Sequence, residues 1–297
     1  MQINKHGSFY IRNGWPTKII DTMDKQTQNT HIFSPNNELE AVDLIGVGRV
    51  MVKALRYWAS ASGITVESKT PQGVVHSLSE IGTLIAQYDP YCRHLGTLWL
   101  LHRNLARNFE EATAWAWAFN IYTAKTFTKD EFVEAFYAYV QTNGGKYARS
   151  AMEKEFDCFK NTYSSDKAFD LNRILDEETV PFFAPLKLLE YTGNGCFEKR
   201  RVESKDVPSK LLLYCILKDN EDHLLTNTQI NVDTLLDSTK QVGKYMNLSY
   251  SALLEMLQQL ENRKLITLVN NFGNRYIEVK PTDTAKLLTD YYKEIEG

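Results

Sequence analysis

Hydrophobic residues recur at helical spacing along most of the chain and alternate as in strands only over short stretches. A short helix is predicted over 38–45, after the Ser-Pro-Asn-Asn at 34–37, and it ends at the glycines of 46–48. A second helix follows over 49–63, with basic residues about one turn apart opposite its apolar side. Its apolar positions are Val50, Met51, Ala54, Leu55 and Trp58. Two helices joined by a glycine turn favour a helix-turn-helix, although a helical hairpin with a solvated basic face fits the same pattern.

Packed helices are predicted over 76–142, where tryptophan and phenylalanine are frequent. These aromatic side chains are expected in the core, and they include Trp99, Trp115, Trp117 and Phe119. Thr128 and Glu131 have the spacing of a capping box and predict the start of a helix. After another helix over 146–163, the pattern becomes strand-like on both sides of the turn at 192–195. Two helices followed by a hairpin suggest a winged-helix unit.

The last third of the chain has the clearest pattern. Three helices are predicted, over 208–219, 232–247 and 250–264, and then two strands, over 266–271 and 275–280. The strands are joined through Asn271-Phe272-Gly273, and three helices followed by a two-stranded wing predict a winged helix. A final helix is expected over 283–295.

The predicted fold is therefore mainly α, with helix-turn-helix and winged-helix units around a helical core and a winged helix at the C-terminal end. Three domains are expected. Residues 1–75 form a helix-turn-helix-like domain, 76–205 a central helical domain with a possible second winged-helix unit, and 206–297 the C-terminal winged helix with the terminal helix.

Composition points to an intracellular globular protein. Hydrophobic residues make up 43% of the 297 residues and charged residues 24%, which are ordinary globular values. The longest apolar runs are too short to cross a bilayer, and the N-terminus lacks the pattern of a signal peptide. The four cysteines are widely spaced, which argues against a CxxC zinc site and predicts free thiols in a reducing cytoplasm. We expect a cytoplasmic protein that does not enter the membrane.

Local charge favours contact with nucleic acid even though the formal net charge is −3. Residues 44–69 hold four basic side chains and one acidic one, and residues 240–280 hold six basic and three acidic ones. Basic segments on an acidic chain can supply phosphate contacts in two places. The residues expected to bind DNA are Arg12, Lys18, Arg49, Lys53, Arg56, Lys240, Lys244, Tyr250, Arg263 and Arg275.

Several segments, in one order, resemble a bacterial family. They are HGSFYIRNGW, IGVGRVMVKALRYW, DPYCRHLGTLWLLH, ATAWAWAFN and EKEFDCFKNTY, spread over about residues 5–205. The chain is thereby similar to the SspB-like family, found beside reductase-like enzymes in DNA phosphorothioation and phage-defence operons. The resemblance implies binding of double-stranded DNA, nicking of one strand to assist sulfur incorporation, and partners that include a sulfur-transfer enzyme and an ATPase. Whether the protein forms a homodimer is left open by the sequence.

The sequence contains no familiar nuclease motif. A nickase commonly holds a divalent metal through carboxylates, so Mg²⁺ or Mn²⁺ is the expected cofactor. Asp89 and His102 are the candidate catalytic residues, from a loose group that also holds His94 and Glu110. The competing interpretation is that His102, on a tryptophan-rich helix, is a hydrogen-bonded core residue.

Three functions remain open at this point. The first is a DNA-nicking component of a phosphorothioation system, which the family resemblance favours. The second is a non-catalytic DNA-binding scaffold or regulator that recruits the modification enzymes, which the absence of a nuclease motif favours. The third is an adaptor whose winged helices face other proteins.

Overall fold

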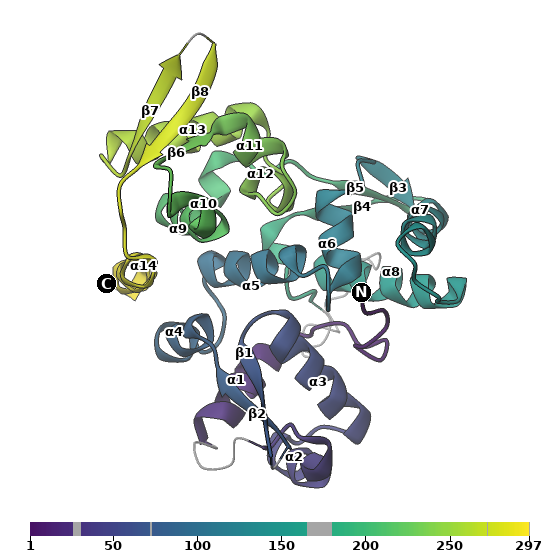
Figure 1. Cartoon of the computed structure of the whole chain (residues 1–297). Helices are drawn as coiled ribbons and strands as arrows, with labels where there is room; N and C mark the ends of the chain where they lie inside the picture. Colours follow the sequence, from purple (N-terminus) through teal and green to yellow (C-terminus); the bar gives the residue numbers. More distant parts are fainter. Residues whose placement is uncertain (26–30, 72, 165–179, 272, 297) are drawn as a thin grey trace. The chain divides into compact units, whose positions relative to one another are not determined.

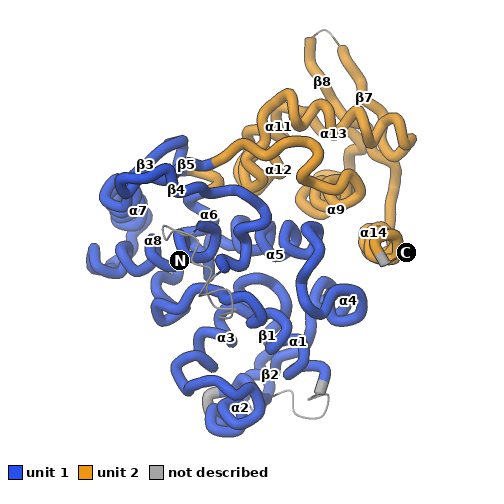
Figure 2. Tube along the Cα trace, turned by 180° about the vertical axis from the view of Figure 1, so that it is seen from behind, with its two compact units in different colours: residues 1–118, 122–199 blue, residues 119–121, 200–297 orange. Residues whose placement is uncertain are grey.

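The structure, a computed structural model, describes residues 1–25, 31–71, 73–164, 180–271 and 273–296. The described residues are mainly helical and include three small antiparallel sheets (Figure 1). They form two compact units (Figure 2). Unit 1 holds residues 1–118 and 122–199, and unit 2 holds residues 119–121 and 200–297. The expected division into three domains, with boundaries after residues 75 and 205, stays a prediction.

Unit 1 begins with a group of helices around a hairpin. These elements are α1 (Trp15–Lys25), the 3-10 turn η1 (Pro35–Asn37), α2 (Glu38–Ile45), α3 (Arg49–Ala61), β1 (Thr65–Thr70), β2 (Gly73–Leu78) and α4 (Glu80–Tyr88). Gly46 ends α2 at a φ of 70°, in the left-handed region that glycine adopts without strain. The helix–glycine turn–helix order predicted for this region is therefore present.

The hairpin of β1 and β2 was not predicted. Its strands pair antiparallel from Thr65 opposite Leu78 to Thr70 opposite Gly73. The sequence TVESKT gives little periodicity because most of β1 is exposed. Packed helices were predicted from residue 76, and this is wrong for 76–78, which end β2.

The rest of unit 1 is a helical core with a small sheet. Its elements are α5 (Leu95–Arg107), α6 (Thr113–Asn120, of which 119–120 belong to unit 2), β3 (Thr126–Thr128), α7 (Lys129–Thr142), α8 (Arg149–Tyr163), η3 (Ala184–Leu186), β4 (Leu189–Gly193) and β5 (Cys196–Lys199). Burial of the four aromatic residues predicted for the core is confirmed, since none is more than 6% exposed. Each buried aromatic side chain removes a large apolar area from water.

The start of α7 confirms the predicted capping box. The Thr128 hydroxyl accepts from the Glu131 N–H, and the Glu131 carboxylate accepts from the Thr128 N–H at 2.7 Å. The predicted strands on either side of 192–195 are confirmed as β4 and β5. The short strand β3 pairs with β5 as a third member of the sheet and was not predicted.

Unit 2 contains helices, a three-stranded sheet and a terminal helix. These elements are η4 (Ser204–Asp206), α9 (Ser209–Asp219), α10 (Glu221–Leu224), β6 (Gln229–Asn231), α11 (Val232–Asp237), α12 (Val242–Tyr245), α13 (Tyr250–Asn262), β7 (Ile266–Asn271), β8 (Asn274–Val279) and α14 (Thr284–Glu296). The sheet order is β6-β8-β7, with β8 in the centre. The predicted hairpin of 266–271 and 275–280 is confirmed; of its turn, Phe272 lies outside the described residues and Gly273 has a φ of 86°.

One helix predicted in unit 2 is wrong. The stretch 232–247 forms two short helices, α11 and α12, in place of one long helix. Gly243 in α12 lies so close to α11 that an added Cβ would be 2.2 Å from the carbonyl oxygen of Leu236. The break therefore lets two helical segments pack against each other through a residue without a side chain.

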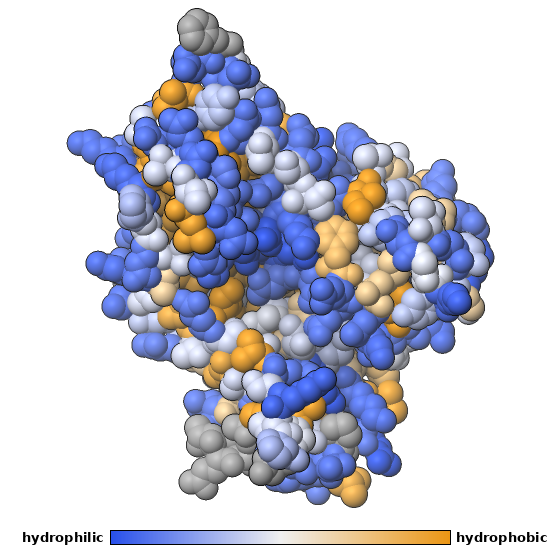
Figure 3. Space-filling model, viewed as in Figure 1, coloured by the Kyte–Doolittle hydropathy of each residue, from blue (hydrophilic) through white to orange (hydrophobic). Residues whose placement is uncertain are grey.

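Among the described residues, no helix combines the length and apolar character that crossing a bilayer requires. On the face drawn in Figure 3, hydrophobic residues are interspersed with hydrophilic ones. The exposed large apolar side chains include Leu39, Val50 and Leu225.

Candidate nucleic-acid interface

Helix α3 presents three basic side chains opposite a buried face. Its buried residues include Val52, Leu55 and Trp58, which fall at helical spacing. Val50 was expected among the apolar residues of this face, but it is 58% exposed. The basic residues are Arg49, Lys53 and Arg56, whose side chains are 66%, 70% and 27% exposed. The predicted basic side of this helix is therefore present.

Each of these cations has a carboxylate partner. Glu38, at the start of α2, accepts a hydrogen bond of 2.8 Å from Arg49 Nε and lies 3.4 Å from Lys53 Nζ. The hydrogen bond from Arg49 lowers the pKa of Glu38, so this carboxylate stays ionised. Arg56 donates from Nε and Nη2 to the two oxygens of Glu67, at 3.3 and 3.4 Å. Two carboxylates therefore offset much of the positive charge of α3.

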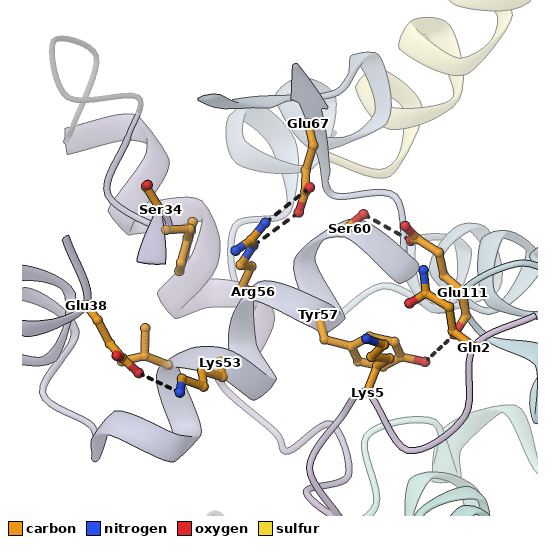
Figure 4. A pocket seen from close by; sticks show the side chains of 12 residues that line it. Gln2, Lys5, Ser34, Glu38, Lys53, Arg56, Tyr57, Ser60, Glu67 and Glu111 are labelled. Carbon is orange, nitrogen blue, oxygen red and sulfur yellow. Dashed lines mark hydrogen bonds and ion pairs between the residues drawn. The ribbon is translucent and has the colours of Figure 1, made fainter. Parts of the chain in front are cut away.

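A cavity of about 550 Å³ in unit 1 is lined by four of these residues, Glu38, Lys53, Arg56 and Glu67 (Figure 4). Its charged lining consists of three cations and three carboxylates: Lys5, Lys53, Arg56, Glu38, Glu67 and Glu111. Figure 4 shows Tyr57 and Ser60 of α3 on the same side as Glu111, to which both donate hydrogen bonds. Burial raises the pKa of Tyr57 well above its usual value, so the phenol remains neutral. A cavity with equal numbers of cations and carboxylates suits a polar ligand that can take the place of one partner in an ion pair.

A buried histidine lies behind Glu67. The Nε2 atom of His76 is 3.7 Å from Glu67 Oε1, and the residue is fully buried with its ring edge-to-face against Phe33. Within the described part of the chain, neither ring nitrogen has a hydrogen-bond partner. Burial lowers the pKa of His76, although Glu67 acts in the opposite direction. The imidazole is therefore neutral at pH 7.

Two further residues predicted to bind DNA, Arg12 and Lys18, lie in unit 1 but do not line this cavity. The Arg12 guanidinium is 5.6–5.9 Å from the ring centres of Phe9, Tyr10 and Trp15. Lys18 donates from Nζ to the carbonyl oxygen of Ile45, at the end of α2. These side chains therefore already have intramolecular contacts.

The remaining predicted residues lie in unit 2, at different places on it. Tyr250 is the first residue of α13, and the Arg275 guanidinium on β8 is 5.9 Å from its ring centre. Arg263 follows the other end of α13, roughly 20 Å along the helix axis. Lys244 lies 3.7 Å from Asp237, and Lys240 has a φ of 67° in the turn between α11 and α12. The fold therefore brings Tyr250 and Arg275 beside each other.

The two candidate catalytic residues are buried. Asp89 is 4% exposed, and its carboxylate accepts from the backbone N–H groups of Arg93 and His94 at 2.8 and 3.0 Å. His102 is fully buried and shares a hydrogen bond of 2.7 Å with the Tyr163 hydroxyl. Burial raises the pKa of Tyr163 well above its usual value. This placement favours the core interpretation of His102, and neither side chain fits a hydrated magnesium ion.

No pattern in the sequence connects α3 to the other cavity residues. Lys5, Glu67 and Glu111 come from distant segments, and no spacing in the sequence relates them to one another. Glu38 is different, because it begins α2, which a short glycine turn joins to α3. Its contacts with Arg49 and Lys53 are therefore made between helices that are neighbours in the chain. Across the described residues, no group of three or more His, Cys, Asp or Glu side chains is arranged to hold a metal ion.

Comparison with solved structures shows which proteins have a similar fold. The fold is that of SspB: a crystal structure of magnesium ion-bound SspB matches 100% of this chain and 89% of its own, with a TM-score of 0.83 and 22% sequence identity. A second SspB crystal structure matches with a TM-score of 0.81 and the same identity and coverage. The chain belongs to the DUF4007 family, described as proteins of unknown function, whose model matches residues 3–292. No curated protein matches. The resemblance to the SspB-like family is therefore confirmed.

Proposed function

We propose that this protein binds double-stranded DNA as a component of a bacterial DNA phosphorothioation and phage-defence system. The carrying observation is the exposed basic side of α3, on a chain that has the fold of SspB over its whole length. Expected partners are the sulfur-transfer enzyme and the ATPase of such a system. A second copy of the chain would suit a two-fold symmetric duplex.

The ion pairs of α3 are compatible with phosphate binding. The Arg49 and Lys53 side chains are about two-thirds exposed, whereas the Glu38 side chain is only 10% exposed. Each cation has several N–H donors, so a phosphate can bind from the solvent side while both cations stay paired with Glu38. Release of condensed counterions from the DNA then supplies the driving force.

The second contact surface belongs to unit 2. Helices α9, α11 and α13, followed by the hairpin of β7 and β8, have the element order of a winged helix. We place α13 as the recognition helix, with Tyr250 at its N-terminal end and Arg275 on the wing. Lys240, Lys244 and Arg263 would contact the DNA backbone.

The test is a salt series with duplex DNA. Replacing Arg49, Lys53 and Arg56 together by glutamine should lower the slope of log K against log salt by about 2.7, at about 0.9 for each lost phosphate contact. A matched control replaces three basic residues elsewhere in unit 1, Lys125→Gln, Lys146→Gln and Lys154→Gln. An unchanged slope and affinity in the folded α3 variant, or an equal loss in the control, would show that this side of α3 is merely solvated.

We also propose that the bound protein nicks one strand of the duplex. Support comes from the family resemblance and from the magnesium ion bound by SspB of the same fold. Because Asp89 and His102 do not fit a magnesium ion, no catalytic step is assigned to them. A DNA-binding scaffold is the alternative, and the absence of a gathered ligand set among the described residues favours it.

Supercoiled plasmid separates these two functions. With Mg²⁺ or Mn²⁺, a nickase converts supercoiled DNA to open circles without linear product, and a chelator abolishes the conversion. Asp89→Asn and His102→Gln serve as structural comparisons, with the helical circular-dichroism signal recorded for each. If the protein binds the plasmid but leaves it supercoiled with both metals, the nickase is excluded and the DNA-binding scaffold remains.

A further inference from the structure

A second cavity in unit 1 has a different chemistry. It has a volume of about 510 Å³, which falls within the range of about 300–1,000 Å³ typical of ligand pockets. Three segments line it: 13–18 at the start of α1, 91–98 from the turn after α4 into α5, and 180–185. The side chains that matter for the argument are Thr17, Lys18, Tyr91, Arg93 and Phe182.

Among the described residues that line this cavity, the charged ones are both positive. They are Lys18 and Arg93, whereas three carboxylates balance the cations of the cavity beside α3. The first turn of α1 also contains no acidic residue. Because the N-terminal end of a helix carries partial positive charge, it adds to the attraction for an anion. The lysine ammonium has three donors, of which one contacts the carbonyl oxygen of Ile45.

An exposed aromatic ring stands beside these cations. Tyr91 is 62% exposed, and the Arg93 guanidinium lies 5.1 Å from its ring centre. A tyrosine ring with a cation nearby is a platform on which a nucleic-acid base stacks, as in proteins that bind single strands. Phe182, which is 5% exposed, and the prolines beside it give the cavity an apolar wall.

Hydrogen bonds to Asp89 hold in place the turn that carries Tyr91 and Arg93. The Asp89 carboxylate accepts from the N–H groups of Arg93 and His94, and the Asp89 carbonyl accepts from the Cys92 N–H at 2.9 Å. Cys92 has a φ of 49° and is buried, where burial raises the pKa of its thiol. A pre-organised turn binds a ligand with a smaller entropy cost than a mobile one.

We propose that this cavity binds one nucleotide, with its phosphate on Lys18 and Arg93 and its base stacked on Tyr91. The inference deepens the proposed function and rests on it in one respect: the nucleotide would belong to an unpaired strand of the bound DNA. A free nucleotide offers the same chemistry, and the probes below distinguish the two sources.

The experiment uses the full chain and four probes. Fluorescein-labelled hexathymidylate reports single-strand binding by anisotropy, and a labelled 20-base-pair duplex is measured beside it. Thymidine monophosphate and thymidine, observed by saturation-transfer NMR, report a free nucleotide with and without its phosphate. The variants are Tyr91→Ala, Tyr91→Phe, Arg93→Gln and Lys18→Gln, with Lys125→Gln as a charge-matched control.

Tyr91→Ala should weaken hexathymidylate binding about tenfold, within the range for loss of one base–aromatic stack, while Tyr91→Phe keeps wild-type affinity within about twofold. Arg93→Gln and Lys18→Gln should each weaken it severalfold, and Lys125→Gln should not. Saturation transfer to thymidine monophosphate but not to thymidine, lost in Tyr91→Ala, also supports the cavity and identifies a free nucleotide if hexathymidylate does not bind.

Two results would overturn the nucleotide site. Equal affinity of wild type and folded Tyr91→Ala for every probe would do so, and so would a wild type that binds the duplex but neither hexathymidylate nor thymidine monophosphate. In both cases the proposed duplex binding through α3 still stands. A wild type that binds none of the probes refutes the nucleotide site and the proposed function together.

Discussion

Glu38 controls how much of the positive charge of α3 is available to a ligand. Its carboxylate contacts both Arg49 and Lys53, and the hydrogen bond from Arg49 lowers its pKa. Because the folded state holds the Glu38 proton less tightly than the unfolded state, these contacts stabilise the protein above the usual glutamate pKa. They are lost as the pH falls through the lowered value. At neutral pH, an anion that approaches α3 therefore meets an ionised Glu38 carboxylate beside the cations.

The buried imidazole of His76 should make the stability of unit 1 depend on pH. Its pKa is lowered mainly by burial, and the charged groups facing it are Glu67 and Arg56. A lowered histidine pKa means that the unfolded chain binds the proton more readily, so stability is lost as the pH falls from about 6.5 toward the lowered value. The thermal midpoint should therefore decrease between pH 7.5 and pH 5.5, and it should decrease less in His76→Phe. Parallel curves for the two proteins would contradict this.

At the scale of elements, two helices can lie close to neighbouring backbone because each has a glycine at the point of contact. Gly82 in α4 and Gly243 in α12 both lie where an added Cβ would be about 2 Å from a backbone oxygen, of Ile64 and Leu236 respectively. Backbone atoms cannot yield as a flexible side chain can. These glycines therefore allow α4 to pack against the residue before β1 and α12 to pack on α11.

Gly243→Ala should destabilise unit 2 by about 3 kcal/mol, the upper end of the usual cost of overpacking. Hydrogen exchange of the α11–α13 amides in the full chain measures the change. Gly48→Ala is the matched control, because Gly48 has a φ of −64° and no heavy atom within 4 Å of an added Cβ. Equal protection in the two variants would mean that α12 can shift without cost.

At the scale of the whole molecule, the chain contributes to unit 2 from two separate places. Residues 119–121, at and just after the end of α6, belong to unit 2 although the segments on both sides belong to unit 1. Phe119 and Asn120 are 6% and 8% exposed. The Asn120 side-chain oxygen accepts from the Lys240 N–H at 2.6 Å and so supports the turn between α11 and α12. A chain beginning at residue 200 would lack this contact.

Asn120→Ala should cost about 1 kcal/mol of unit 2 stability, because the Lys240 N–H loses its acceptor. Faster exchange of the Lys240 amide in the full chain is the expected signal. The same replacement at Asn262, exposed at the end of α13, should leave that amide unchanged. An unaltered exchange rate in Asn120→Ala would show that water replaces the lost acceptor.

Local patterns in the sequence were sufficient for most helices and two hairpins. The capping box at Thr128, the glycine turn after α2 and the β7–β8 hairpin depend on contacts between residues near one another in the chain, so their residue types specify them directly. The strand β1 was missed because it is mostly exposed and its sequence shows little alternation, although it pairs with the adjacent β2. The strand β3, which pairs with the distant β5, and the break between α11 and α12 depend on tertiary packing and were also missed. The basic side of α3 could also be predicted from a local pattern, since helical spacing alone aligns Arg49, Lys53 and Arg56.

The site itself was decided only by the tertiary structure. Helical spacing determined that α3 carries three cations, but the fold determined that Glu38 and Glu67 are paired with them. The sequence could not distinguish a catalytic His102 from a core one, because the difference is the burial that Tyr163 and the surrounding rings provide. It also could not place Tyr91 with Lys18, which lie 73 positions apart and line one cavity. Periodicity records what one element does by itself, whereas charge pairing, burial and cavities arise where several elements meet.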